Sequence, residues 1–364
     1  MTLDQRARRA AQGFRRGVES MRTTDPASPE RFERYRARKQ RNQRIGAVLV
    51  AGTVAVAALV LLTKTFPRTE RNRPAEPSSN GPIVFGRAVP GVDGIRLFTV
   101  NADGTGETAL PVTFTDCAAW SPDGTKMQVT GSDFPGAPLR PAIVNADGSG
   151  LRVLDVPAPK ELSLGCGAWS PDGTRLALEG FTETGPPELS GLYTVRASDG
   201  GDLRKVSDVA GANPEYSPDG TQIVSIGGDP TRDLKPSAGA LFVVNTDGSG
   251  LRRLTEWGIA QRSGGSWSPD GEWILFQRTG GGLMMVRPDG SDLHEIPIEG
   301  LPQGAHATEP RWSPDGTMIV FGVVANGQED LYIVRSDGTE LMQLTDTPDV
   351  DERRPAWGPS IVPN

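Results

Sequence analysis

The chain has 364 residues, with 45 glycines, 31 prolines and only 6% aromatic residues. High turn content with an ordinary apolar fraction favours many short strands. The net charge of −7 is uneven, because residues 1–44 contain thirteen Lys/Arg and five Asp/Glu, or +8, which leaves −15 for the remainder. Since the basic excess is confined to this short segment, we expect no nucleic-acid partner.

The basic segment, residues 1–44, carries apolar residues at steps of three or four, which predicts one apolar stripe of a helix surrounded by arginine. Such a helix suits three roles: lying on anionic lipid, docking to a cytosolic protein, or setting membrane topology by charge alone. The stripe consists of Leu3, Ala7, Ala10, Phe14, Val18 and Met21.

An uncharged run of nineteen residues follows at residues 45–63, bounded by Arg44 and Lys64. A helix of this length spans about 28 Å, which matches a bilayer core. A buried soluble helix and a cleaved signal peptide are the alternatives, but 44 residues precede the run and no clean cleavage site follows it. We interpret the run as an uncleaved transmembrane signal anchor.

Basic residues flank this run unequally, with seven Lys/Arg in residues 31–44 and four in residues 64–73. The more basic flank stays in the cytoplasm. We therefore expect a single-pass protein of the cell membrane, with its N-terminus cytoplasmic and its C-terminal part extracytoplasmic. Residues 64–81 are rich in proline and predict an extended linker.

A repeated Trp-Ser-Pro-Asp-Gly motif dominates the chain from residue 82 onward. Ser-Pro-Asp-Gly is a tight-turn sequence, because proline presets φ, Asp suits the next position and glycine accepts a left-handed conformation. We therefore assign the repeated Asp to turn capping and not to catalysis or metal binding. Copies lie at residues 120–124, 169–173, 267–271 and 312–316, with a variant at Tyr216 and a truncated copy at Trp357.

Apolar strands, an Asp-Gly hairpin and a short final strand follow the motif, as in residues 223–226, 241–244 and 251–255. Successive aromatic positions lie 49, 47, 51, 45 and 45 residues apart. Four strands in about 47 residues is the size of one β-propeller blade. The six units predict an all-β, six-bladed β-propeller over residues 82–364, with tryptophan packed between blades.

These repeats resemble the TolB-type β-propeller family, which is marked by Trp-Ser-Pro-Asp-Gly and a later Asn-Ala-Asp-Gly-Ser-Gly. Residues 145–152 and 245–255 are near-consensus copies of the second motif. The resemblance covers residues 82–364 and implies the fold but no function, since the repeat occurs in many settings. TolB itself carries an α/β domain before its propeller, and we expect no such domain here.

The first unit begins at Ile83, at the strand that normally follows the motif, and it lacks a tryptophan strand of its own. The last copy, residues 355–359, is a tryptophan strand with nothing after it. We expect this C-terminal strand to complete the first blade, which would close the ring and remove an exposed sheet edge.

Loops that enter the tryptophan strands are expected to form the mouth of the central channel. The residues three before each aromatic are chemically varied, whereas the turn residues are uniform. Variation within a repeat marks where a specific site would lie. The candidate ligand- or partner-binding residues are Asp116, Asn213, Glu309, Arg353 and Arg354.

The two cysteines, Cys117 and Cys166, both lie three residues before a tryptophan. If the tryptophan strands are the inner ones, equivalent positions in consecutive blades approach closely, and an extracytoplasmic compartment permits oxidation. We therefore expect a disulfide between them. Two buried free thiols are the alternative.

The whole pattern favours a membrane-tethered binding module for a protein or a small ligand, and not an enzyme. No Gly-x-Ser-x-Gly, His-Glu-x-x-His or Cys-x-x-Cys motif is present, so no catalytic residue, metal or cofactor is expected. One alternative is a transmembrane sensor that reports the ligand state of the propeller to a cytosolic partner of residues 1–44. Another is a propeller hydrolase or lactonase using Asp116, Glu215 and Glu309.

Overall fold

The computed structural model describes residues 79–89, 95–112, 117–131, 138–209, 211–228 and 238–360. The predicted basic segment, the predicted membrane helix at residues 45–63 and all but the last three residues of the predicted linker lie outside these ranges. Within the described ranges, no helix has both the length and the apolar character needed to span a bilayer. The anchor and its orientation therefore stay predictions.

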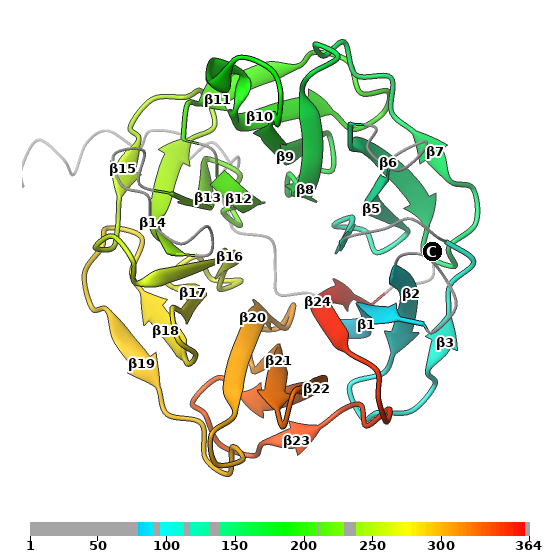
Figure 1. The fold of residues 1–364 in the computed structure, drawn as a ribbon, viewed down its shortest axis with the longest axis vertical. Helices are drawn as coiled ribbons and strands as arrows, with labels where there is room; N and C mark the ends of the chain where they lie inside the picture. Colours follow the sequence, from blue (N-terminus) through cyan, green and yellow to red (C-terminus); the bar gives the residue numbers. More distant parts are fainter. Residues whose placement is uncertain are drawn as a thin grey trace, which may run out of the picture. The chain divides into compact units, whose positions relative to one another are not determined.

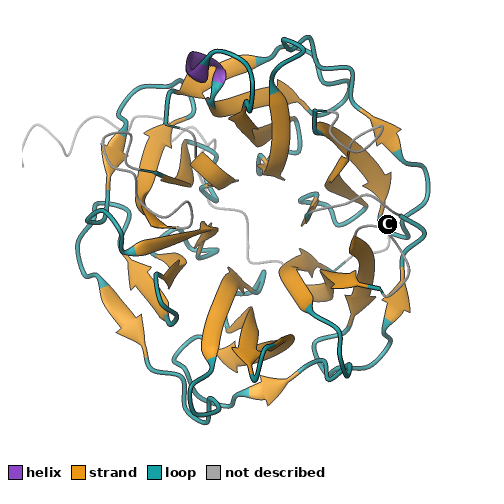
Figure 2. Ribbon diagram, in the orientation of Figure 1, coloured by secondary structure: helices purple, strands orange, loops and turns teal. Residues whose placement is uncertain are grey.

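Strands and turns make up nearly all of the described chain, as Figure 2 shows, with one short 3-10 helix at Pro187–Leu189. Groups of four consecutive strands follow one another round a ring (Figure 1), so the prediction of an all-β propeller is confirmed. The first group combines strands from both ends of the described chain: β24 (Glu352–Pro359), β1 (Asn80–Ala88), β2 (Ile95–Val100) and β3 (Thr108–Ala109).

The next two groups are formed by local sequence, with each strand hydrogen-bonded to the one before it. The second group contains β4 (Ala118–Trp120), β5 (Lys126–Gly131), β6 (Arg140–Asn145) and β7 (Arg152–Val153). The third contains β8 (Ser163–Trp169), β9 (Arg175–Phe181), β10 (Gly191–Arg196) and β11 (Arg204–Ser207).

The remaining three groups follow the same order along the chain. The fourth contains β12 (Gly211–Tyr216), β13 (Gln222–Gly227), β14 (Ala238–Asn245) and β15 (Arg252–Arg253). The fifth contains β16 (Ala260–Trp267), β17 (Ile274–Arg278), β18 (Leu283–Val286) and β19 (His294–Ile296). The sixth contains β20 (His306–Trp312), β21 (Met318–Ala325), β22 (Gln328–Arg335) and β23 (Met342–Gln343).

The fourth and fifth groups are joined into one eight-stranded sheet, whereas the other four groups are separate four-stranded sheets. The link is short, because β14 pairs with β16 only at Ala238↔Gln261 and Gly239↔Ala260. These two residues of β14 extend beyond its pairing with β13, which ends at Gly227↔Ala240. The described chain therefore forms four separate four-stranded sheets and one eight-stranded sheet, which corrects the prediction of six separate blades.

The Ser-Pro-Asp-Gly turns have the predicted capping geometry. In the second group, the Ser121 hydroxyl donates to Asp123 Oδ1 at 2.6 Å, and the backbone N–H of Thr125 donates to the same oxygen at 3.0 Å. Gly124 has φ of 69°, which only glycine adopts without strain. The turn Asp residues therefore stabilise the blades and are occupied by local hydrogen bonds.

The apolar core lies between neighbouring groups. One cluster joins Val84 and Leu97 of the first group to Met127 and Val129 of the second, all almost fully buried. Another joins the fourth and fifth groups in the same manner. Because each face of a blade is covered by the next blade, the inner strands are held at fixed positions round the axis.

Ring closure by the C-terminal strand is confirmed. Strand β24 pairs antiparallel with β1, with Ile83 opposite Trp357 and Arg87 opposite Glu352. The indole Nε1 of Trp357 also donates to Gly81 O at 3.0 Å. The first blade is therefore built from segments more than 260 residues apart.

Candidate functional site

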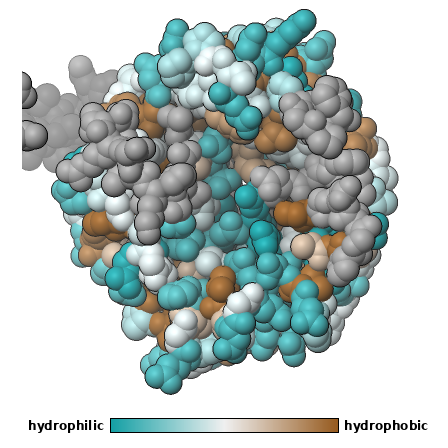
Figure 3. All heavy atoms as spheres, in the orientation of Figure 1, coloured by the Kyte–Doolittle hydropathy of each residue, from teal (hydrophilic) through white to brown (hydrophobic). Residues whose placement is uncertain are grey.

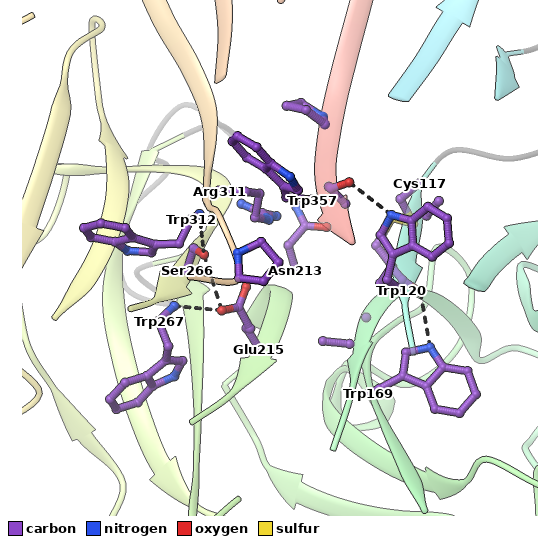
Figure 4. A pocket seen from close by; sticks show the side chains of 18 of the residues that line it. Cys117, Trp120, Trp169, Asn213, Glu215, Ser266, Trp267, Arg311, Trp312 and Trp357 are labelled. Atoms are coloured by element: carbon purple, nitrogen blue, oxygen red, sulfur yellow. Dashed lines mark hydrogen bonds between the residues drawn. A yellow bond between two sulfur atoms is a disulfide. The ribbon is translucent and has the colours of Figure 1, made fainter. Parts of the chain in front are cut away.

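Inner strands β4, β8, β12, β16, β20 and β24 surround a cavity of about 400 Å³ on the axis of the ring (Figure 4). In the view of Figure 3, hydrophilic residues gather round the centre of the ring. The volume lies within the roughly 300–1,000 Å³ typical of small-ligand pockets. The sequence predicted a site in the loops that enter the tryptophan strands, and the structure has a cavity along those strands.

A bulge shapes the wall on several inner strands. The pairing register shifts between Ala212 and Glu215 in β12, and between Thr308 and Arg311 in β20. An extra residue of this kind bends the strand and re-aims the neighbouring side chains. Left-handed φ angles occur three residues before the aromatic, at Asn213 (44°), Gly264 (97°), Glu309 (47°) and Arg354 (55°).

Opposite halves of the wall differ in chemistry at the residue directly before each aromatic. The first three groups place Ala356, Ala119 and Ala168 there, and the last three place Glu215, Ser266 and Arg311. At this position one half of the wall, the apolar half, carries alanine, and the other half, the polar half, presents a carboxylate, a hydroxyl and a guanidinium.

On the apolar half, tryptophans tie neighbouring blades together through their rings. Trp120 Nε1 donates to Ala356 O and Trp169 Nε1 donates to Ala119 O, each at 3.2 Å. These bonds confirm the prediction that tryptophan packs between blades.

On the polar half, the side chains of Glu215 and Ser266 link neighbouring blades instead, by accepting backbone N–H groups. The backbone N–H of Trp267 donates to Glu215 Oε1 at 2.7 Å, and the N–H of Trp312 donates to Ser266 Oγ at 3.4 Å. The buried indole Nε1 atoms of Trp267 and Trp312 have no hydrogen-bond partner among the described residues. The indole N–H groups are therefore hydrogen-bonded in Trp120 and Trp169 on the apolar half, but not in their equivalents on the polar half.

Glu215 is the most strongly perturbed acid of the cavity wall. Burial raises the pKa of its carboxyl to about 7, although the charge of Arg311 and the hydrogen bonds from Trp267 and Ser266 oppose the shift. Part of its surface still opens to the cavity. At neutral pH the Glu215 carboxyl is therefore poised between its two protonation states.

Replacing this acid by its amide should change how stability depends on pH. The folded state binds the extra proton between pH 4.5 and about 7, so native stability should fall as pH rises through that range. Glu215→Gln keeps an acceptor for Trp267 and should be more stable than the native chain at pH 8 by on the order of 1–3 kcal/mol. Urea unfolding at pH 5 and pH 8, with exposed Glu299→Gln as control, checks this. A pH-independent difference would contradict it.

A second charged pair lies between β20 and β24. The backbone N–H of Arg354 donates to Glu309 Oε2 at 2.7 Å, and Arg354 Nε lies 3.7 Å from Glu309 Oε1. The guanidinium also reaches Cys166, with 3.8 Å between Nη1 and Sγ. Glu309 and Arg354 are thus held by each other, unlike Glu215 and Arg311.

The predicted disulfide between Cys117 and Cys166 is present, with the two Cα atoms 5.9 Å apart. It joins the residue before β4 to β8, and both cysteines line the cavity. The bond therefore fixes the distance between two neighbouring blades at the apolar half of the wall.

Loss of the disulfide should weaken the propeller. Non-reducing mass spectrometry of the exported chain should recover one peptide pair that contains Cys117 and Cys166. The Cys117→Ser/Cys166→Ser variant should lose about 2–4 kcal/mol of unfolding free energy, because its unfolded state is no longer restricted by the cross-link. Two freely alkylated thiols in the folded native chain would show that the bond is absent.

Three of the five predicted site residues, Asn213, Glu309 and Arg354, line the cavity. Arg353 does not line it, and its Nη2 pairs with Asp351 Oδ2 at 2.7 Å. Asp116 lies outside the described residues.

Ser266 and Arg311 were not predicted as site residues, and Glu215 was predicted only as a carboxylate of the alternative hydrolase. Their signal was available at the position directly before the aromatic, where the other three units have alanine. This position and the one two residues earlier share a face of the strand by regular alternation, and both line the cavity. Among the described residues, no cluster of His, Cys, Asp and Glu could hold a metal ion.

The ring of four-stranded groups around a lined channel defines a β-propeller. Residues 120–361 match the TolB beta propeller domain family, and the chain belongs to this family. The resemblance seen in the repeats is therefore confirmed. A comparison with curated proteins finds no match.

Solved structures show the same fold at low sequence identity. TolB from Acinetobacter baumannii superposes with a TM-score of 0.60 at 19% identity, over 77% of this chain and 67% of that chain. A putative TolB from Agrobacterium tumefaciens gives 0.56 at 21% identity, over 78% and 100%. A chain of a nidogen/laminin complex gives 0.56 at 11% identity, over 76% and 98%. Identities this low establish the fold alone.

Proposed function

We propose that this chain is a membrane-tethered binding module whose propeller lies outside the cytoplasm and holds a small ligand, or part of a protein, in its central channel. The observation that carries the proposal is the cavity of about 400 Å³ with one charged and one apolar half. A purely structural channel would repeat the same residues in every blade, as the turns do. Here Glu215, Arg311, Glu309 and Arg354 break the repeat within a single cavity.

Membrane tethering rests on the sequence of residues 45–63 and on the unequal basic flanks. Protease added to intact spheroplasts should degrade the propeller and leave the N-terminal segment intact. Protection of the propeller until the membrane is opened would reverse the proposed orientation.

Site-specific photocrosslinking tests whether the channel binds a partner. A photoreactive amino acid at position 213, on the cavity wall, should capture a partner in native membranes. The same group at position 293, on the exposed outer edge of the ring, is the matched control. Arg354→Gln should reduce capture from position 213, because it removes a charge from the wall. Equal capture from both positions, or none from position 213, would contradict a channel-binding role.

A sensor is the second candidate, supported by the apolar stripe within the basic residues 1–44. In that case ligand binding at the propeller changes what the cytoplasmic segment binds. Affinity purification with residues 1–44 as bait should return a cytosolic protein, and a variant with Phe14→Glu should not. Recovery of lipid alone would favour simple anchoring.

A further inference from the structure

We propose that the polar half of the channel cavity binds a free α-amino acid, with Arg311 facing its carboxylate, Glu215 facing its ammonium group and the apolar half holding its side chain. This inference rests on the proposed function and deepens it, because it names a ligand for the same cavity.

Arg311 lines the cavity without a carboxylate partner among the described residues. Its guanidinium donates to two backbone carbonyls, Pro310 O at 2.9 Å and Ser263 O at 3.5 Å. Arginine carries five N–H donors and a permanent charge. A guanidinium that is anchored by backbone groups, with donors to spare, has the geometry to receive a carboxylate from a ligand.

Glu215 offers the complementary charge on the neighbouring part of the wall. Its Oε1 accepts hydrogen bonds from Trp267 and Ser266, and its Oε2 accepts none from the described residues. Arg311 and Glu215 influence each other electrostatically, yet they form no ion pair within 4.0 Å. Figure 4 shows them near one another beside Ser266. A ligand that carries both charges would bridge this gap.

Two unpartnered polar atoms lie within the wall of the same half. Ser263 and Trp267 are 7% and 6% exposed, line the cavity, and carry Oγ and Nε1 atoms without a hydrogen-bond partner among the described residues. Buried polar groups are almost always hydrogen-bonded in native proteins. Both atoms are buried within the wall, so they mark unsatisfied polar groups of this half and are not surfaces that a ligand contacts directly.

The opposite half suits an apolar side chain. Its wall consists mainly of small and aromatic residues and the cystine, and the Arg354 guanidinium borders it, 3.8 Å from Cys166 Sγ. A basic side chain is disfavoured there, because it would meet this positive charge without a partner of its own. The residues concerned are Ala118, Ala119, Trp120, Ala168 and the Cys117–Cys166 disulfide.

The pH dependence of ligand affinity distinguishes this proposal from binding by packing alone. The ammonium group of a ligand stabilises ionised Glu215, whose pKa is about 7 in the free protein. Affinity should therefore be roughly tenfold higher at pH 8 than at pH 6, as the ionised fraction rises. The other charged groups that line the cavity are Arg311 and Glu309 on β20 and Arg354 on β24.

Calorimetric titration of the purified full-length chain tests the proposal with L-leucine and L-phenylalanine as probes. N-acetyl-leucine lacks the ammonium group, leucinamide lacks the carboxylate, and glycyl-leucine separates the two. Each of these three should bind at least tenfold more weakly than leucine. Glu215→Gln and Arg311→Met should each reduce leucine affinity at least tenfold, and the exposed Arg204→Met should not.

Several outcomes would overturn this ligand class. One is that free amino acids do not bind to a chain that melts cooperatively. Another is that the blocked forms bind as tightly as leucine. A third is that Arg311→Met has the same leucine affinity as the native chain. If Glu215→Gln fails to fold, the blocked ligands and Arg311→Met still decide. Crosslinking of a protein from position 213 without amino-acid binding would refute this ligand class while leaving the channel-binding function standing.

Discussion

Deletion of residues 354–364 is expected to unfold the propeller or make it aggregate. The deletion removes most of β24 and with it Trp357, which packs against Ile83 and Phe85 in a buried cluster. Trp120 of the next blade loses its acceptor, Ala356 O. Strand β1 would then be an open edge of apolar residues, which favours pairing with other chains.

Circular dichroism melting and light scattering measure this outcome. A synthetic peptide of residues 350–364 added to the truncated chain should restore part of the melting transition, because it supplies the missing strand. The same peptide with Trp357→Ala should restore much less. A truncated chain that melts cooperatively at the temperature of the full chain would show that β24 is not needed for closure.

Arg87→Met is expected to cost about 3–5 kcal/mol, the usual effect of breaking a buried ion pair. Arg87 Nε donates to Glu352 Oε1 at 2.8 Å, and its two terminal nitrogens donate to Glu107 at 2.7 Å each. The guanidinium also lies 4.3 Å from the ring centre of Phe98. Glu352 is fully buried, so removal of Arg87 leaves a buried carboxylate without its partner.

A double-mutant cycle separates the ion pair from packing. Because the uncompensated charge is the main penalty, Arg87→Met/Glu352→Leu should recover much of the stability lost in Arg87→Met. Urea unfolding at pH 7 gives the free energies, with Arg335→Met as an exposed control. A double variant that loses the sum of the two single losses would mean that the pair contributes no coupling.

Repeats made most of the fold predictable. Ser-Pro-Asp-Gly dictates one turn conformation through proline, Asp and glycine, so each copy places a hairpin without reference to the rest of the chain. The closure was also predictable from the repeats. The unit that begins at Ile83 lacks a tryptophan strand, and the strand of Trp357 is a tryptophan strand without the rest of its unit, so the two complete each other. The β14–β16 link was not predictable, because it depends on two residues extending past a neighbouring strand, and no local motif encodes this.

The site was predicted only in part, because the alternation of side chains along a strand was not applied to the tryptophan strands. Regular alternation sends every second side chain to the channel. Glu309 and Arg311 lie two residues apart and both line the cavity, whereas Arg353, which is next to Arg354, does not. The left-handed φ of Glu309 and Arg354 was not predictable, since these residue types ordinarily avoid it.

The seam between β1 and β24 has a kinetic consequence for the whole ring. The backbone N–H of Ser360, the last described residue, donates to the carbonyl oxygen of Ser79, the first described residue. Bringing such distant segments together is slow, because the entropy of a long loop is lost before any contact repays it. Blades made of local sequence are therefore expected to form first and the seam last. The ring would also open at this seam first, so the lifetime of a closed channel depends on the contacts that hold β24 against β1.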